Sequence, residues 1–116
     1  MATHVISRAE VAAALAKAVR PEVLRADEGM LCLRRFRKDW PNLVRLGVSE
    51  LLVAHADMLA WNHGLRGYDA VNLAAASLWQ EMLAQPVTFA CFDSRLRAAA
   101  RELGLLIYPE DRGPLT

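Results

Sequence analysis

Residues 64–105 read GLRGYDAVNLAAASLWQEMLAQPVTFACFDSRLRAAARELGL, and this segment alternates between helical and strand patterns. Its first half predicts an apolar helix over residues 68–83, and its second half predicts an unbroken apolar strand over residues 87–92. A carboxylate stands at two of the junctions: Asp69 where the helix begins and Asp93 directly after the strand. Acidic residues at strand ends and helix starts of an α/β chain are candidates for holding a divalent metal ion.

The rest of the chain continues the alternation of helices and strands. Two further strands are predicted over residues 43–48 and 105–108. Helices bounded by proline, glycine or capping residues are predicted over residues 7–19, from 22 or 27 to 39, 49–63 and 94–103. The predicted fold class is α/β, because strands that alternate with helices imply a parallel sheet with helices on both faces. The length of 116 residues suits a single domain over residues 1–116.

The amphipathic patterns predict which side chains face the core. In the helix that ends at Asp39, three apolar residues are expected to face inward, namely Leu31, Leu33 and Phe36. The polar side of this helix is basic and holds Arg34, Arg35, Arg37 and Lys38. In the helix over residues 94–103, three arginines are predicted to point outward, namely Arg95, Arg97 and Arg101. A glycine in a helix is unfavourable, so Gly29 is expected to weaken the start of its helix.

Composition sets few limits on the partners. The formal net charge is +1, so a nucleic-acid-binding surface would have to be local. Cys32 and Cys91 are far apart and form no CxxC motif, which suggests neither a thiol redox motif nor a zinc site. No apolar run reaches the ~20 residues of a membrane helix, and no signal-peptide pattern opens the chain. We therefore expect a reduced, soluble, cytoplasmic protein.

Each of three carboxylates has a purely structural interpretation. Ser7 and Glu10 have the spacing of a capping box, in which the hydroxyl caps the helix and the acid reaches back to the cap amide. Asp69 suits the dipole of a first helical turn, and Asp93 suits the N-cap of the helix that begins at Ser94. Each of the three acids therefore has two alternative interpretations, a structural role at a helix start and a role in metal binding.

Topology favours the metal-binding interpretation. Asp93 follows the carboxyl end of a strand, which is where open parallel sheets bind their ligands. If Glu10 and Asp69 face the same crevice, three carboxylates share one site. Two unit charges ~4 Å apart repel by about 4 kcal/mol at an effective dielectric constant near ~20. Such a cluster takes up protons or binds a cation, and Mg²⁺ is a hard ion that suits oxygen ligands.

Three segments resemble a known family, the PIN domains, and specifically the VapC-type toxin ribonucleases. Residues 65–74, LRGYDAVNLA, resemble the family's helix start (L)(R)xYDAxHLA. Residues 87–96, VTFACFDSRL, are similar to its strand that ends in an aspartate, VTFxTFDxxL. Residues 7–15 resemble the helix that carries the family's glutamate. The similarity covers nearly all of the 116 residues.

The resemblance implies a fold, an activity and partners. The fold would be a PIN-like three-layer α/β/α domain with a short parallel sheet. The activity would be that of a Mg²⁺-dependent endoribonuclease of a toxin–antitoxin system, with Mn²⁺ as an alternative ion and a metal-bound water attacking the RNA phosphodiester. Glu10, Asp69 and Asp93 would be the catalytic and metal-binding residues. The partners would be RNA, a VapB-like antitoxin protein and further copies in a homodimer or higher oligomer, with no membrane.

The chain departs from the family at its N-terminus. PIN domains begin with a central strand that carries the first metal-binding aspartate in a motif like LDTSALV, whereas Met1 to Ile6 is too short for this and carries no acid. A start codon assigned too late, a truncated gene or a strand supplied by another chain would each explain the difference. Unpaired strand edges then predict marginal stability or an oligomer. The alternative function is a catalytically inactive PIN remnant that binds an antitoxin-like peptide or forms oligomers.

Polar residues near the acids are secondary candidates. Asn72 lies one helical turn from Asp69 and could orient it, although a surface amide is an equally open interpretation. Arg66 and Arg95 could contact RNA phosphates, because cations supply most non-specific affinity for nucleic acid. The basic residues 34–38 could also contact phosphates, and a solvated helix face explains them as well.

Overall fold

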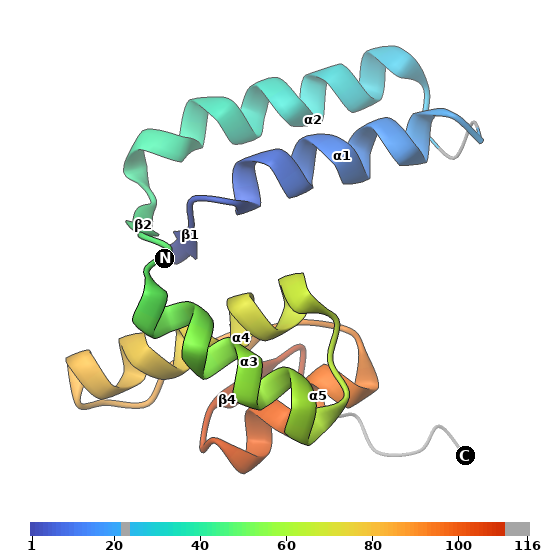
Figure 1. Cartoon of the computed structure of the whole chain (residues 1–116). Helices are drawn as coiled ribbons and strands as arrows, with labels where there is room; N and C mark the ends of the chain where they lie inside the picture. The colour runs from blue at the N-terminus through green and yellow to red at the C-terminus, as the bar shows by residue number, and fades with distance from the viewer. Residues whose placement is uncertain (22–23, 111–116) are drawn as a thin grey trace. The chain divides into compact units, whose positions relative to one another are not determined.

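The computed structural model describes residues 1–21 and 24–110 of the chain (Figure 1). Its internal contacts divide the chain into two compact units, Met1–Gly47 and Val48–Thr116. Among the described residues, no helix combines the length and the apolar character that crossing a bilayer requires.

The first unit is a pair of helices with a short strand before and after it. Its elements are β1 (Ala2–His4), α1 (Ser7–Val19), α2 (Ala26–Asp39), the 3-10 helix η1 (Trp40–Asn42) and β2 (Val44–Leu46). β1 and β2 pair in parallel, with Thr3 opposite Arg45. The sequence did not predict β1, because a strand of 3 residues is too short to show an alternating pattern.

Trp40 is the buried aromatic residue of this unit. Its side chain is 8% exposed, and its ring centre lies 5.6 Å from that of Phe36 one turn earlier. The guanidinium groups of Arg8 and Arg45 lie 5.8 and 5.9 Å from the centre of the Trp40 ring, within cation–π range. The indole therefore links α1, the end of α2 and β2 in a single contact group.

The apolar face of α2 is narrower than the sequence predicted. Leu33 and Phe36 are half-buried, as expected. Leu31 is 65% exposed, so the prediction that it faces the core is wrong. The reason is helical geometry: Leu31 precedes the buried Trp40 by two and a half turns, which places the two residues on opposite sides of the helix axis.

The start of α1 differs from the predicted capping box. The helix begins at Ser7 itself, Ile6 takes the N-cap position, and no side chain caps the helix. Ser7 is buried, and its Oγ accepts a hydrogen bond of 2.6 Å from Oγ1 of Thr3 on β1. The hydroxyl is thus engaged with the strand, and the capping-box interpretation of Glu10 is wrong.

Gly29 has a packing role that the sequence analysis missed. It is buried on α2, and a Cβ atom at this position would lie 2.6 Å from Cγ2 of Val19 on α1. Carbon atoms do not pack that closely, so the absence of a side chain lets the two helices approach each other here. The weak helix propensity of glycine is offset by this contact.

We expect Gly29→Ala to lower the free energy of unfolding by about 1–2 kcal/mol, because the added methyl group overpacks against Val19. The matched control is Gly67→Ala, at the first residue of α4, where an added Cβ meets nothing within 4 Å. This control is expected to raise stability by about 0.4–1 kcal/mol through the unfolded state. Chemical denaturation of both variants measures the difference, and equal stabilisation by both changes would contradict the packing role.

The second unit holds the segment 64–105. Its described elements are α3 (Glu50–His63), α4 (Gly67–Leu83), β3 (Thr88–Ala90), α5 (Ser94–Glu102) and β4 (Leu106–Tyr108). The helix boundaries agree closely with the predicted ones. Ser49 caps α3 by accepting a hydrogen bond of 3.1 Å from the Leu52 amide, and Gly64 ends it in the left-handed conformation with a φ of 63°.

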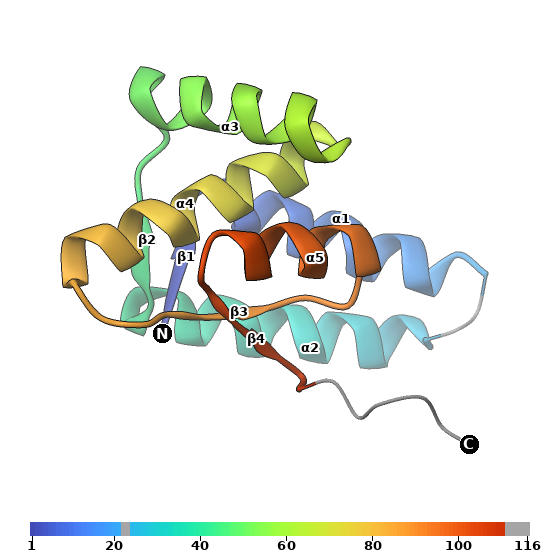
Figure 2. The ribbon, with the colours of Figure 1, turned by 90° about the horizontal axis from the view of Figure 1, so that it is seen from below.

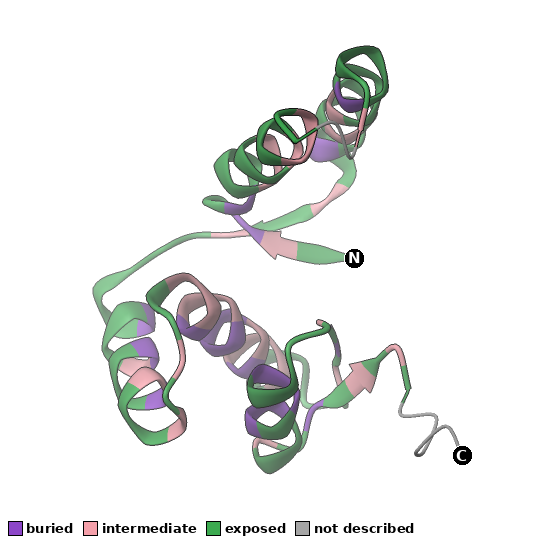
Figure 3. Cartoon of the chain, turned by 90° about the vertical axis from the view of Figure 1, so that its right-hand side faces the viewer, coloured by how far each residue is buried: buried purple, intermediate pink, exposed green. Residues whose placement is uncertain are grey.

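The buried faces of α3, α4 and α5 turn toward one another (Figure 3). Their buried apolar residues are Leu52, Ala56 and Leu59 on α3, Ala70, Leu73, Ala74 and Ala75 on α4, and Leu96, Ala99 and Ala100 on α5. Gln80 fixes both ends of the β3–α5 segment. Its Nε2 donates to the Leu103 carbonyl at 3.3 Å, and its Oε1 accepts from the Val87 amide at 3.0 Å.

The described strands form two separate two-stranded parallel sheets, β1–β2 and β3–β4. In the second sheet Phe89 lies opposite Ile107. The α/β class is therefore confirmed. A strand lies within each of the three predicted ranges, but each is only three residues long, so the unbroken strand over residues 87–92 is shorter than predicted. The single sheet with helices on both faces is not formed by these strands. The physical reason is that periodicity predicts where a strand lies and leaves its pairing partner undetermined.

Candidate metal and phosphodiester site

Asp93 lies at the junction of β3 and α5 and caps the helix. Its Oδ1 accepts a hydrogen bond of 2.9 Å from the Leu96 amide, and its backbone is extended as an N-cap requires. The residue is exposed. The capping interpretation is therefore confirmed. The second carboxylate oxygen, Oδ2, accepts no hydrogen bond from the described part of the chain.

Asp69 lies in the first turn of α4 and is half-buried. No side chain caps this helix, whose N-cap residue is Arg66. The carboxylate thus lies at the positive end of the helix dipole. Within residues 1–21 and 24–110 its oxygens accept no hydrogen bond.

The helices that carry these two acids begin at the same end of the second unit. Figure 2 shows α4 and α5 running in the same direction from neighbouring starts. A hydrogen bond supports this arrangement: Nη1 of Arg95, in the first turn of α5, donates to the Gly64 carbonyl at 3.1 Å, three residues before α4 begins. The structure therefore brings the two helix starts with Asp69 and Asp93 together at one end of the unit.

The pKa of the Cys91 thiol depends on the charged groups near the starts of α4 and α5. Burial raises the pKa of Cys91, Arg97 lowers it, Asp93 and Asp69 raise it further, and Arg101 lowers it. Both carboxylates therefore act on a single point at the end of β3. The two arginines place compensating positive charge close to the same point.

Arg97 holds the ends of β3 and β4 together. Its Nη1 donates to the Cys91 carbonyl at 2.9 Å, and its Nη2 donates to the Pro109 carbonyl at 2.7 Å. The residue is only 9% exposed, so the prediction that it points outward is wrong. A signal was available in the sequence, because Arg97 lies four positions after the N-cap Asp93 and three before Ala100, on the inward stripe of the helix.

Glu10 lies in the first unit, one turn into α1, and is exposed. Its charge acts on the buried His4 of β1: burial lowers the pKa of His4, and the Glu10 carboxylate raises it. The residue is thereby placed near the end of β1. Asp69 and Asp93 belong to the other unit.

The secondary candidates lie around the starts of α4 and α5. Asn72 is half-buried one turn after Asp69, and Arg66 and Arg95 are exposed. Among the described residues, no group of three or more His, Cys, Asp or Glu side chains has the arrangement of a metal site. The second unit thus carries Asp69 and Asp93 at two neighbouring helix starts.

Comparison with known proteins yields no assignment: no family model matches the chain, and no curated protein matches it. The resemblance to PIN domains therefore stays a prediction that rests on residues 7–15, 65–74 and 87–96.

Proposed function

We propose that the chain is a magnesium-dependent endoribonuclease of the PIN type, acting in the cytoplasm as the toxin of a toxin–antitoxin pair. The observation that carries this proposal is the position of Asp69 and Asp93 at two helix starts that lie at the same end of the second unit. One of these helices, α5, begins after a connection of three residues from the parallel strand β3, and the carboxyl end of a parallel strand is where α/β folds bind ligands.

The residues present fit a hard divalent cation. The Asp69 oxygens and Oδ2 of Asp93 accept no hydrogen bond from the described residues, and both carboxylates raise the pKa of Cys91. Magnesium keeps several waters and needs only one or two carboxylates from the protein. The proposed ligands in the second unit are Asp69 and Asp93. When bound, the ion would supply charge neutralisation at the phosphodiester and activation of water.

The other candidates would position the acids and the substrate. Asn72 would hold Asp69 by a contact one helical turn away, and Arg66 would present its exposed guanidinium to an RNA phosphate beside Asp69. Arg95 already donates to the Gly64 carbonyl, so its role would be to keep the start of α5 beside the start of α4. Oligomers and a VapB-like antitoxin are proposed partners on the family resemblance alone.

The test is cleavage of a 5′-labelled single-stranded RNA by the full chain in Mg²⁺ and in EDTA. We expect cleavage in Mg²⁺ and its loss in EDTA. We also expect a decrease of about 100-fold for Asp69→Asn, which corresponds to a few kcal/mol of lost charge stabilisation. The matched control is Asp57→Asn, which removes an exposed acid of α3 in the same unit and is expected to cleave normally. Cleavage that persists in EDTA, or an Asp69→Asn variant as active as the control, would refute the metal site.

A second candidate function is a binding module without catalysis. The observation that favours it is the structural task of Asp93, which caps α5 whether or not a metal is bound. Each described strand also pairs with a single neighbour, and free strand edges suit the addition of a strand from a partner. This candidate predicts no cleavage in single-turnover conditions and no thermal shift with Mg²⁺.

A further inference from the structure

The near-neutral charge of the whole chain conceals a strong contrast between its two units. Residues 1–47 contain nine Lys and Arg against five Asp and Glu, whereas residues 48–116 contain five against eight. The first unit is thus basic and the second acidic. Such an asymmetry within one chain is typical of proteins in which one part meets a polyanion.

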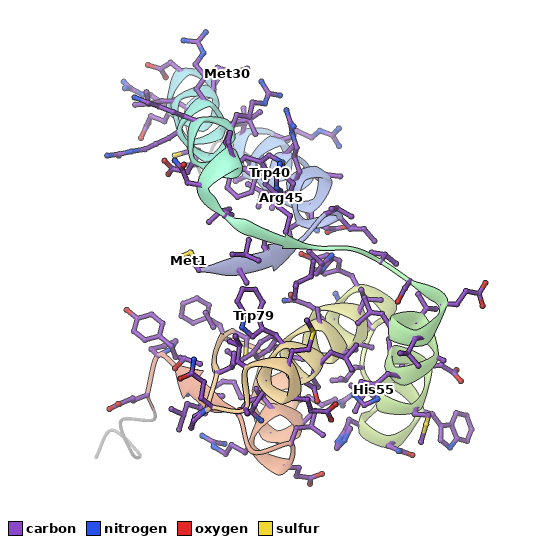
Figure 4. All side chains as sticks on the ribbon, turned by 90° about the vertical axis from the view of Figure 1, so that its left-hand side faces the viewer. Met1, Met30, Trp40, Arg45, His55 and Trp79 are labelled. Carbon is purple, nitrogen blue, oxygen red and sulfur yellow. The ribbon has the colours of Figure 1, made fainter. Side chains whose placement is uncertain are left out.

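The excess positive charge is concentrated on α2. Arg34, Arg35, Arg37 and Lys38 are all exposed. At 3.6 residues per turn they cover an arc of about 160° around the helix axis. The opposite arc holds Leu33, Phe36 and the following Trp40, which are buried or half-buried. Figure 4 shows nitrogen-tipped side chains projecting outward from the helix that carries Met30.

None of these four cations forms an ion pair with a carboxylate in the described part of the chain. Arg25, the N-cap residue of α2, differs from these four cations, because it forms ion pairs with Glu28 at 2.8 Å and with Asp27 at 3.4 Å. Arg34 and Lys38 are four positions apart, and like charges at this spacing destabilise a helix by about 0.2–0.5 kcal/mol. The helix dipole offsets this for Arg37 and Lys38 in the last turn, but not for Arg34 and Arg35.

We propose that this basic face of α2, formed by Arg34, Arg35, Arg37 and Lys38, binds the phosphate backbone of RNA. Charge complementarity carries the choice of partner: unpaired guanidinium groups bind phosphates bidentately, and three of the four residues are arginines. The choice of RNA as the nucleic acid rests on the proposed function. A membrane surface fits less well, because an interfacial helix needs a free apolar face, and that of α2 is turned to Trp40 and α1.

The proposal is tested by fluorescence anisotropy with a labelled 20-nucleotide single-stranded RNA of mixed sequence, using the full chain in EDTA over a range of salt. Binding without Mg²⁺ is read separately from cleavage. The test variant is R34Q/R37Q/K38Q, and the matched control is K17Q/R20Q/R25Q, which removes the same charge from exposed positions of the same unit. Glutamine keeps a good helix propensity at the three substituted positions of α2.

We expect the test variant to bind RNA at least about 10-fold more weakly at ~0.1 M salt. The plot of log K against log salt is expected to become shallower by about 2, because three phosphate contacts are lost. The control is expected to change the affinity by less than about threefold. Equal losses in both triple variants would overturn the proposal, because net charge would then explain the binding. So would unchanged RNA binding by the test variant, or binding to phosphatidylserine vesicles or to a polyglutamate peptide in place of RNA. The two proposals are tested separately. RNA binding in EDTA can fall while Mg²⁺-dependent cleavage is retained, and cleavage can be lost while RNA binding is retained.

Discussion

Replacing Asp93 by Asn is expected to reduce Mg²⁺-dependent RNA cleavage by about 100-fold or more, while the melting temperature stays within about 2 °C of the parent value. Asp and Asn are equally good N-caps, so the hydrogen bond from the Leu96 amide to the side-chain Oδ1 is preserved. The amide lacks the negative charge that a divalent ion requires. Asp93→Asn thus separates the structural task of this residue from its proposed chemical one.

Asp93→Ala supplies the comparison. This change removes the cap as well, and is expected to cost about 1 kcal/mol of stability in addition to the loss of cleavage. Thermal melts and initial cleavage rates on the same preparations measure both effects. An Asp93→Asn variant that cleaves RNA at the parent rate would reduce Asp93 to a capping residue, and the nuclease proposal would then lose one of the two acids in the second unit.

Local signals in the sequence predicted the second unit well. The cap at Ser49, the left-handed stop at Gly64 and the acid after β3 all depend on residues within one helical turn of each other. Such short-range chemistry is readable because backbone amides at a helix start need a nearby acceptor. The placement of Asp69 and Asp93 at helix starts followed from the same signals.

The features that the sequence did not predict depend on contacts between different elements of the fold. Ser7 satisfies a capping pattern but is engaged by Thr3, and Gly29 suits a helix only because Val19 packs against it. The pairing of β1 with β2 and of β3 with β4 likewise joins strands separated by a helix or more. Periodicity carries no information on such partners. Whether Glu10 joins the two aspartates is a question of the same kind, and it stays a prediction.

Arg97→Met is expected to lower the free energy of unfolding by about 3 kcal/mol, which corresponds to a fall of about 10 °C in melting temperature for a chain of this size. The guanidinium is 9% exposed and donates to the carbonyls of Cys91 and Pro109, so methionine fills the space but leaves both acceptors unsatisfied. Hydrogen bonds from a charged donor contribute about 1.5–3 kcal/mol each, and partial solvation of the freed carbonyls reduces the sum. The ends of β3 and β4 would then separate first.

The matched control is Arg95→Met, two residues earlier on the same helix. Arg95 is exposed and makes a single hydrogen bond of 3.1 Å to the Gly64 carbonyl, so the expected loss is below about 1 kcal/mol. Arg97→Lys is expected to fall between the two, because an ammonium group keeps the charge but lacks the planar fork that reaches two separate carbonyls. Hydrogen exchange of the Cys91 amide, which donates to the Tyr108 carbonyl at 3.0 Å, gives a local measurement beside the global melt. Equal losses from Arg97→Met and Arg95→Met, with unchanged protection of this amide, would show that Arg97 does not hold the strand ends together.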